Sequence, residues 1–488
     1  SCGNRETGGT PLESTTVFGD NRPVNTQGEV TMQPPETAAF ERRLLWLSVL
    51  LITVGAFEAL ALTTVMPVVS RDLDGAKLYA LALGVPLATH VISTTFAGRW
   101  VDARGPYYPI LTGCGLAAAG LCVAGFAHVM ELVALGRAIM GLGTGLLMVS
   151  LYAMVGGLIP VKKQPMFFAV FAAAWVVPSM FGPYFAGVIA EIWSWRIVFV
   201  GVVPLLIFAI AAMIPLLRPV PRTHDKLWTN KKQPLMLLFA IGAGAGAALM
   251  QVVTAGRNLL AAFVFVLTAA GVLYLLHLLL PPGTLSARRN QVGAAIATRM
   301  WTNAGVVATE AFLPLMLVQV HGWSEKSAGI VLAIGGITWG IGSVIQGRIH
   351  TQAIRERLPV IGGMLATCGV GLAAFSSLSF IPPITTAIAW VLAGLGIGLT
   401  LPAMSVVALA VTPKAEHGSI SASLQIVDGI GAALAIGIVG FFQMVPHLEL
   451  WPGSGNGNPF VFGLVCMAGL CALSTFTARR VPRVETEL

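Results

Sequence analysis

The chain has 488 residues, of which 56% are hydrophobic and 10% are charged, and its formal net charge is +8. A soluble protein with so little charge would expose large apolar patches and aggregate, so the composition excludes a string of ordinary soluble domains. The basic residues lie in short segments between apolar runs and not on one face of a folded domain, which argues against nucleic-acid binding. The sequence therefore indicates a polytopic integral membrane protein.

The apolar runs are about 20 residues or longer, which is the length that a helix needs to cross a hydrocarbon core about 30 Å thick. We predict an all-α fold with fourteen membrane spans after a polar, disordered cytoplasmic tail over residues 1–43. The predicted spans are 44–69, 76–98, 107–127, 131–158, 164–190, 195–217, 234–254, 257–281, 293–320, 327–347, 357–380, 384–412, 418–445 and 460–478. The seventh is rich in Gly and Ala and could instead be a short or re-entrant segment.

The distribution of Lys and Arg orients these spans. An even number of spans places both termini on one side, and the loops and flanking segments of that side hold twenty Lys and Arg. The opposite loops hold five, which are Arg71, Lys77, Arg196, Arg257 and Lys326. Because cytoplasmic loops of membrane proteins carry an excess of positive residues, we predict a cell-membrane protein with both termini in the cytoplasm.

Several landmarks recur in the second half of the chain at offsets between 249 and 253 residues. The pairs are Gly98 with Gly347, Gly141 with Gly394, Pro160 with Pro413, and Glu58 with Glu310. They predict two six-helix bundles, residues 44–217 and 293–478, in the same orientation and related by a pseudo-twofold axis along the membrane normal. The linker 218–292 would carry the two extra central spans, and residues 479–488 would form a short cytoplasmic tail.

Ionisable residues inside predicted spans are the strongest candidates for function. Because a charge at the centre of a bilayer costs several kcal/mol, such residues usually face a cavity or a partner. Glu58 and Arg137 are each predicted about 21 Å from the cytoplasmic surface, by counting 1.5 Å per residue from the span ends. We therefore assign Glu58, Arg137 and Asp428 to proton coupling. Arg299 lies near the end of its span, where its side chain can extend to the interface.

The remaining candidates are weaker, and a purely structural role stays open for each of them. Glu58 and Glu310 are predicted to face a substrate cavity, together with the aromatic residues Phe171, Trp175 and Trp390. No GxxxxGK[ST] phosphate loop, HExxH motif, GxSxG elbow or CxxC pair occurs in the sequence. We therefore expect no enzymatic activity, no cofactor and no bound metal.

Four segments carry a resemblance to a known family. They are Gly98-Arg-Trp-Val-Asp102-Ala-Arg104-Gly105 after the second span, Arg137-Ala-Ile-Met-Gly141 in the fourth, Pro178-Ser-Met-Phe-Gly182-Pro183-Tyr-Phe-Ala-Gly187 in the fifth, and Glu58 nine residues before Pro67 in the first. Together they resemble the signature loop, the fourth-span motif, the antiporter motif and the first-span acid of the fourteen-span drug–proton antiporters of the major facilitator superfamily. The resemblance covers residues 44–478. The chain departs from the family pattern at Pro106-Tyr107, where a basic pair is usual, and at Pro178 and Ala186, where glycines are usual. The first-span acid is also Glu and not Asp.

The first and third of these segments are assigned to conformational gating by the resemblance, through Gly98, Asp102, Arg104, Gly105, Pro178, Gly182, Pro183 and Gly187. Physically, an acid in the loop after the second span can lie against the N-terminus of a helix that enters from the cytoplasm. The eleventh and thirteenth spans begin there, and residues 418–421 (Gly-Ser-Ile-Ser) are a candidate capping segment. Proline and small residues in the fifth span favour a kink and close helix packing.

The resemblance implies a secondary active transporter, expected to be a monomer, that exports small lipophilic compounds, cations among them, in exchange for protons by alternating access. Two alternatives stay open. One is export of an endogenous lipid or metabolite, and the other is a membrane sensor or scaffold that transports nothing.

Overall fold

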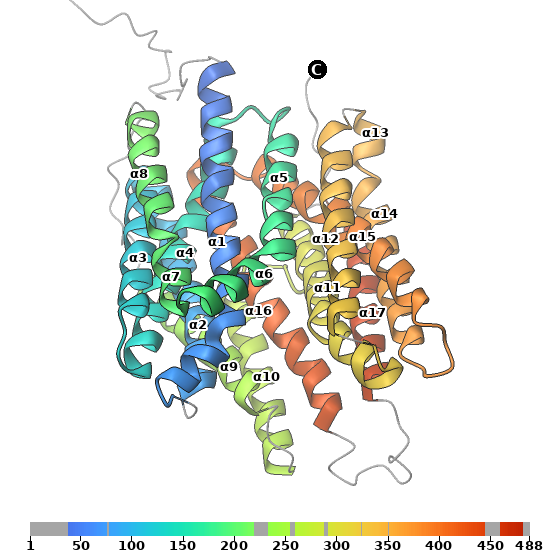
Figure 1. Ribbon diagram of the computed structural model, residues 1–488. Coiled ribbons are helices and arrows are strands. Elements are labelled where there is room, and N and C mark those ends of the chain that lie inside the picture. Colours follow the sequence, from blue (N-terminus) through green and yellow to red (C-terminus); the bar gives the residue numbers. More distant parts are fainter. Residues whose placement is uncertain are drawn as a thin grey trace, which may run out of the picture. The chain divides into compact units, whose positions relative to one another are not determined.

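The computed structural model of the chain describes residues 38–75, 78–218, 233–253, 259–286, 291–323, 325–349, 351–444 and 459–481. The regular secondary structure in these ranges is helical throughout (Figure 1). Most of the predicted disordered tail lies outside the described residues. The first helix begins at Ala38, six residues before the predicted start of the first span.

Eight helices form the first group: α1 (Ala38–Asp72), α2 (Tyr79–Arg104), α3 (Tyr107–Gly125), α4 (Met130–Leu158), α5 (Gln164–Ala173), α6 (Val176–Ile192), α7 (Trp195–Val200) and α8 (Val203–Leu217). Two helices follow: α9 (Gln233–Val253) and α10 (Leu259–Leu279). The last group is α11 (Val292–His321), α12 (Glu325–Arg348), α13 (Gln352–Arg355), α14 (Leu358–Ser376), α15 (Ile384–Ala410), α16 (His417–Met444) and α17 (Pro459–Ala478). The predicted fifth and sixth spans are each divided, into α5 with α6 and α7 with α8.

Ten helical segments within the described ranges are long and apolar enough to cross a membrane, with α7 and α8 counted as one. Two shorter apolar stretches are Gln164–Pro178, which includes the break between α5 and α6, and Leu235–Met250. The chain is thus an all-α membrane protein that crosses the bilayer many times. The full number of fourteen spans and the predicted domain boundaries stay predictions.

Proline and glycine set several helix ends. Proline stands in the first turn of α8 and α14, where its missing N–H costs no helical hydrogen bond. Gly105 follows α2 with φ 75°, and Gly322 follows α11 with φ 66°. Glycine adopts such positive φ angles without the clash that a side chain would cause, so the chain can turn sharply at both points.

Close glycine contacts join α3 to α4 and α14 to α15. A Cβ on Gly113 would lie 2.8 Å from the carbonyl oxygen of Gly143, and a Cβ on Gly362 would lie 2.7 Å from that of Gly396. These positions correspond in the repeat, since Gly362 is 249 residues after Gly113 and Gly396 is 253 residues after Gly143. The small residues allow close backbone packing of the two helices in each pair.

The first and last helix groups meet where α2 ends and α16 begins, which we call the Asp102 end. A Cβ on Gly98 of α2 would lie 2.8 Å from the carbonyl oxygen of Gly418 of α16. The two groups also meet where Gly347 of α12 packs on α5, with a Cβ there 2.9 Å from the Ala169 Cβ and 3.3 Å from the Pro165 carbonyl oxygen. Backbone contacts this short leave no space between the helices, so the two groups are closed against each other at this end.

The helices α9 and α10 pack against each other and against both groups. Gly244 of α9 lies against the backbone of Ala88 in α2, and Phe265 of α10 stacks on Phe441 of α16 with ring centroids 5.2 Å apart. The two extra helices therefore bridge α2 and α16 on one flank of the bundle.

Candidate functional site

Two buried charges from the first helix group lie near each other. Glu58 of α1 is 5% exposed and Arg137 of α4 is 3% exposed. Their charges interact electrostatically, but no ion pair within 4.0 Å joins them in the described structure. Arg137 instead donates from Nε to the backbone carbonyl of Ala82 in α2, at 2.7 Å. Its Nη1 is buried and has no hydrogen-bond partner among the described residues.

The sequence of α2 and α4 explains this placement. A Cβ on Gly141, one turn after Arg137, would lie 2.4 Å from the carbonyl oxygen of Pro86, so only glycine allows α4 to come this close to α2. Pro86 lies inside α2, four residues after Ala82. Because proline has no backbone N–H, the Ala82 carbonyl lacks its usual helical donor and is available to Arg137.

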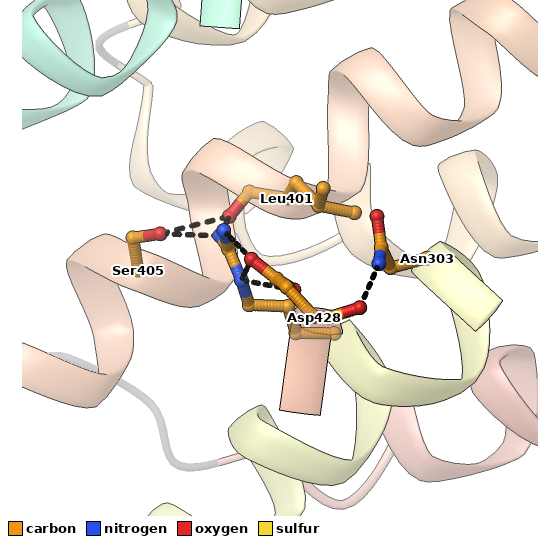
Figure 2. Close-up of polar contacts among 5 residues, drawn as sticks. Asn303, Leu401, Ser405 and Asp428 are labelled. Carbon is orange, nitrogen blue, oxygen red and sulfur yellow. Dashed lines mark hydrogen bonds and ion pairs between the residues drawn. The ribbon is translucent and has the colours of Figure 1, made fainter. Parts of the chain in front are cut away.

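A second polar cluster lies within the last helix group, around the buried Arg299 and the Asp428 side chain, which is 22% exposed. The side chain of Arg299 in α11 forms an ion pair with Asp428 of α16, with Nη2 2.5 Å from Oδ2 and Nε 3.0 Å from Oδ1 (Figure 2). Nη1 donates to the carbonyl of Leu401 at 3.0 Å and to the hydroxyl of Ser405 at 2.7 Å, both in α15 (Figure 2). Asn303 donates to the backbone carbonyl of Asp428. These hydrogen bonds offset the cost of removing the Arg299 charge from water.

This cluster also contacts the first helix group. The guanidinium carbon of Arg299 lies 5.7 Å from the ring centroid of Tyr152 in α4. The Tyr152 ring packs in turn on Phe168 and Phe171 of α5, at centroid distances of 5.2 and 5.8 Å. The Arg299–Asp428 pair is therefore placed where the two helix groups meet.

The other predicted cavity residues lie in different surroundings. Glu310 is half-buried in α11 and has no polar partner among the described residues. Trp175 is half-buried at the junction of α5 and α6. Phe171 and Trp390 are buried, at 1% and 3% exposure, and the Trp390 ring packs against Gly335 of α12. In this conformation Phe171 and Trp390 contact neighbouring side chains.

The Asp102 carboxylate caps the start of α16. It accepts hydrogen bonds from the backbone N–H of Gly418 at 2.6 Å, from the backbone N–H of Ser419 at 2.9 Å and from the Ser419 hydroxyl at 2.5 Å. This is the contact that the sequence predicts between an acid in this loop and residues 418–421. Asp102 lies beyond the predicted second span, and burial raises its pKa to about 6, although the Ser419 hydroxyl, both amides and the charge of Arg99 oppose the rise.

The other predicted gating residues lie in two places. Gly98 and Gly105 adjoin Asp102, and Arg104 is exposed beside them. The segment from Pro178 to Gly187 lies in α6, and the side chain of Pro183 is outside the described structure. The break between α5 and α6 falls four residues before Pro178, where the hydroxyl of Thr53 donates to the freed carbonyl of Ala174 at 3.4 Å.

Sequence comparisons identify one family, and a comparison with solved structures shows a matching fold. Residues 45–436 match the profile described as Major Facilitator Superfamily. A probable multidrug-efflux transporter of Mycobacterium tuberculosis is 26% identical over 445 residues, which are 86% of this chain and 92% of that protein. The multidrug transporter protein MdtP of Bacillus subtilis is 23% identical over 448 residues, or 85% of this chain and 80% of that protein. The human organic anion transporter MFSD10 has the same fold, with a TM-score of 0.69 at 13% identity over 91% of this chain and all of that chain.

Proposed function

The chain belongs to the major facilitator superfamily and is a secondary transporter, and we propose that it exports small lipophilic compounds, cations among them, in exchange for protons. The proposal rests chiefly on the buried Glu58 and Arg137, which interact without forming an ion pair. A carboxyl placed this way can exchange a proton without first breaking a salt bridge. The names of the bacterial relatives support efflux as the direction of transport.

We further propose the orientation and the state of the molecule. The Asp102 end faces the cytoplasm, as the distribution of Lys and Arg predicts, and the fourteen spans include α9 and α10. The conformation described is then the one closed to the cytoplasm, with the Asp102–Ser419 contact and the glycine contacts holding it shut. Opening of the cytoplasmic side requires these contacts to separate, and Gly98, Arg104 and Gly105 then act with Asp102 as the gate.

In this cycle Glu58 binds a proton that enters from outside and releases it to the cytoplasm when substrate binds from that side. Arg137 lowers the cost of the negative charge left on Glu58, since an opposite charge nearby favours the ionised form. Asp428 is proposed as the coupling group of the second half, because its protonation would release Arg299 from the ion pair. Glu310, without a polar partner among the described residues, is the proposed acceptor for a cationic substrate.

Substrate-induced proton release from the purified, detergent-solubilised protein tests this proposal. A library of lipophilic cations, neutral drugs and bilayer amphiphiles is added in weakly buffered solution, and the pH change is followed. Release is expected with the cations, and Glu58→Gln is expected to abolish it while substrate binding persists. Proton release that Glu58→Gln leaves intact would contradict the proposal. Release only with bilayer amphiphiles would favour export of an endogenous lipid.

A further inference from the structure

Pro86 lies inside a helix, where proline is usually disruptive, and it frees a backbone carbonyl that a buried arginine uses. It lies in the middle of α2, where proline removes one backbone hydrogen bond and leaves the carbonyl four residues earlier without its donor. That carbonyl belongs to Ala82, and its oxygen accepts the hydrogen bond from Nε of Arg137. The charged group beside Glu58 is thus held by a carbonyl that receives no helical hydrogen bond from residue 86.

The second half of the molecule has the same backbone contact without the polar pair. A Cβ on Gly141 would lie 2.4 Å from the carbonyl oxygen of Pro86, and a Cβ on Gly394 would lie 2.4 Å from that of Gly335. With the offsets of 249 and 253 residues, Gly335 corresponds to Pro86 and Trp390 corresponds to Arg137. The two helix pairs therefore pack alike but differ in side chains. The first half has Pro86 with Arg137, and the second half has Gly335, which is covered by the Trp390 ring.

We propose that Pro86 is a positioning residue for the proton site, because the acceptor it creates holds Arg137 beside Glu58 without an ion pair between them. Arg137 is 3% exposed, so its guanidinium must find acceptors within the protein. With the Ala82 carbonyl available, Nε is satisfied and Arg137 does not need the Glu58 carboxylate. The buried Nη1, which lacks a partner among the described residues, is left to respond when Glu58 loses its proton.

Replacing Pro86 by a residue with an N–H changes which acceptor Arg137 uses. The Ala82 carbonyl then receives the helical hydrogen bond, and the best remaining acceptor for the guanidinium is the Glu58 carboxylate. A closer Arg137 favours the ionised carboxylate, so proton uptake needs a higher proton concentration. This inference rests on the proposed proton coupling, and it adds the residue that sets the pH at which coupling operates.

The test is the pH dependence of substrate-induced proton release and of transport in proteoliposomes, measured for the wild type, Pro86→Ala and Pro86→Gly. We expect the midpoint of both profiles to move to lower pH by about one unit or more in the two variants, the size of effect that a closer opposite charge produces. Pro215→Ala is the matched control, because Pro215 also lies inside a helix, α8, and is exposed. It should leave the midpoint unchanged.

Two further variants test whether the shift comes from the N–H that Pro86→Ala introduces, and whether it acts through Glu58. Incorporation of lactic acid at position 86 gives an ester that lacks the N–H, as proline does, and should keep the wild-type midpoint. In a Glu58→Gln background only substrate binding is expected to persist, and Pro86→Ala should leave the pH dependence of that binding unchanged, because the group that responds is absent. Active Pro86→Ala and Pro86→Gly proteins with the wild-type midpoint would overturn the inference, as would an ester variant that behaves like Pro86→Ala. Absence of any proton coupling in the wild type would instead refute the proposed function.

Discussion

Removal of the Asp428 carboxylate should destabilise the protein strongly. In Asp428→Ala, the Arg299 guanidinium, with its side chain 4% exposed, would keep the Leu401 carbonyl, the Ser405 hydroxyl and the Tyr152 ring as neighbours but no opposite charge. Removing one partner of a buried ion pair costs about 3–5 kcal/mol, because the charge that remains, here on Arg299 at 4% exposure, is left uncompensated. At ~1.4 kcal/mol for each factor of ten, the folding equilibrium should change by between about a hundredfold and a few thousandfold.

The assay is unfolding in mixed micelles of increasing SDS content, followed by far-ultraviolet circular dichroism. Glu41→Ala is the matched control, because Lys163, the cation that it leaves unpaired, is 55% exposed, and pairs with an exposed partner contribute less than about 1 kcal/mol. The double variant Arg299→Met with Asp428→Leu removes both charges and should unfold within about 1 kcal/mol of the wild type. The reasoning fails if Asp428→Ala costs no more than Glu41→Ala, or if the double variant is no more stable than Asp428→Ala.

Three further predictions follow from the same contacts. Because burial raises the pKa of Asp102 to about 6 from an ordinary value of 3.8, closure of the Asp102 end should be strongest below about pH 4 and weaken as the pH rises through 6. The rate at which a cysteine introduced at this end reacts with a thiol reagent should show that pH dependence, and Asp102→Asn should remove it. Glu310→Gln should weaken transport of cationic substrates severalfold and spare neutral ones, with Glu131→Gln as an exposed control; equal loss for both classes would assign Glu310 to packing. Reporter fusions at residues 225 and 285 should both report a cytoplasmic location, and an external signal at either would contradict the fourteen-span count.

The sequence predicted the helical fold and the contact of Asp102. The helical fold follows from the long apolar runs, and the contact of Asp102 with α16 follows from an acid placed opposite a Gly-Ser helix start. Helix formation and the Gly-Ser helix start are local signals. The Asp102 contact itself joins residues 316 apart, and it was predicted from the attraction of an acid to a helix N-terminus and not from local pattern.

The partners of buried charges were harder to predict. Arg299 and Asp428 are 129 residues apart, and the position of Arg299 near a span end favoured an extended side chain directed to the interface. The bond from Arg137 to the Ala82 carbonyl was also missed, although Pro86 was a readable signal for a free acceptor four residues earlier. The assignment of Phe171 and Trp390 to a cavity stays a prediction, because sequence does not distinguish an aromatic residue that lines a cavity from one packed between helices, and both are buried in this conformation.

The central claim is that proton movement through Glu58 drives uphill transport. The most direct measurement is accumulation of a fluorescent lipophilic cation by proteoliposomes under an imposed pH gradient, with the wild type and Glu58→Gln compared at equal reconstituted amounts. The account predicts that the wild type accumulates the cation against its gradient, and that Glu58→Gln only equilibrates it across the bilayer. Uphill accumulation by Glu58→Gln at the wild-type rate, or accumulation that survives collapse of the pH gradient, would contradict the account.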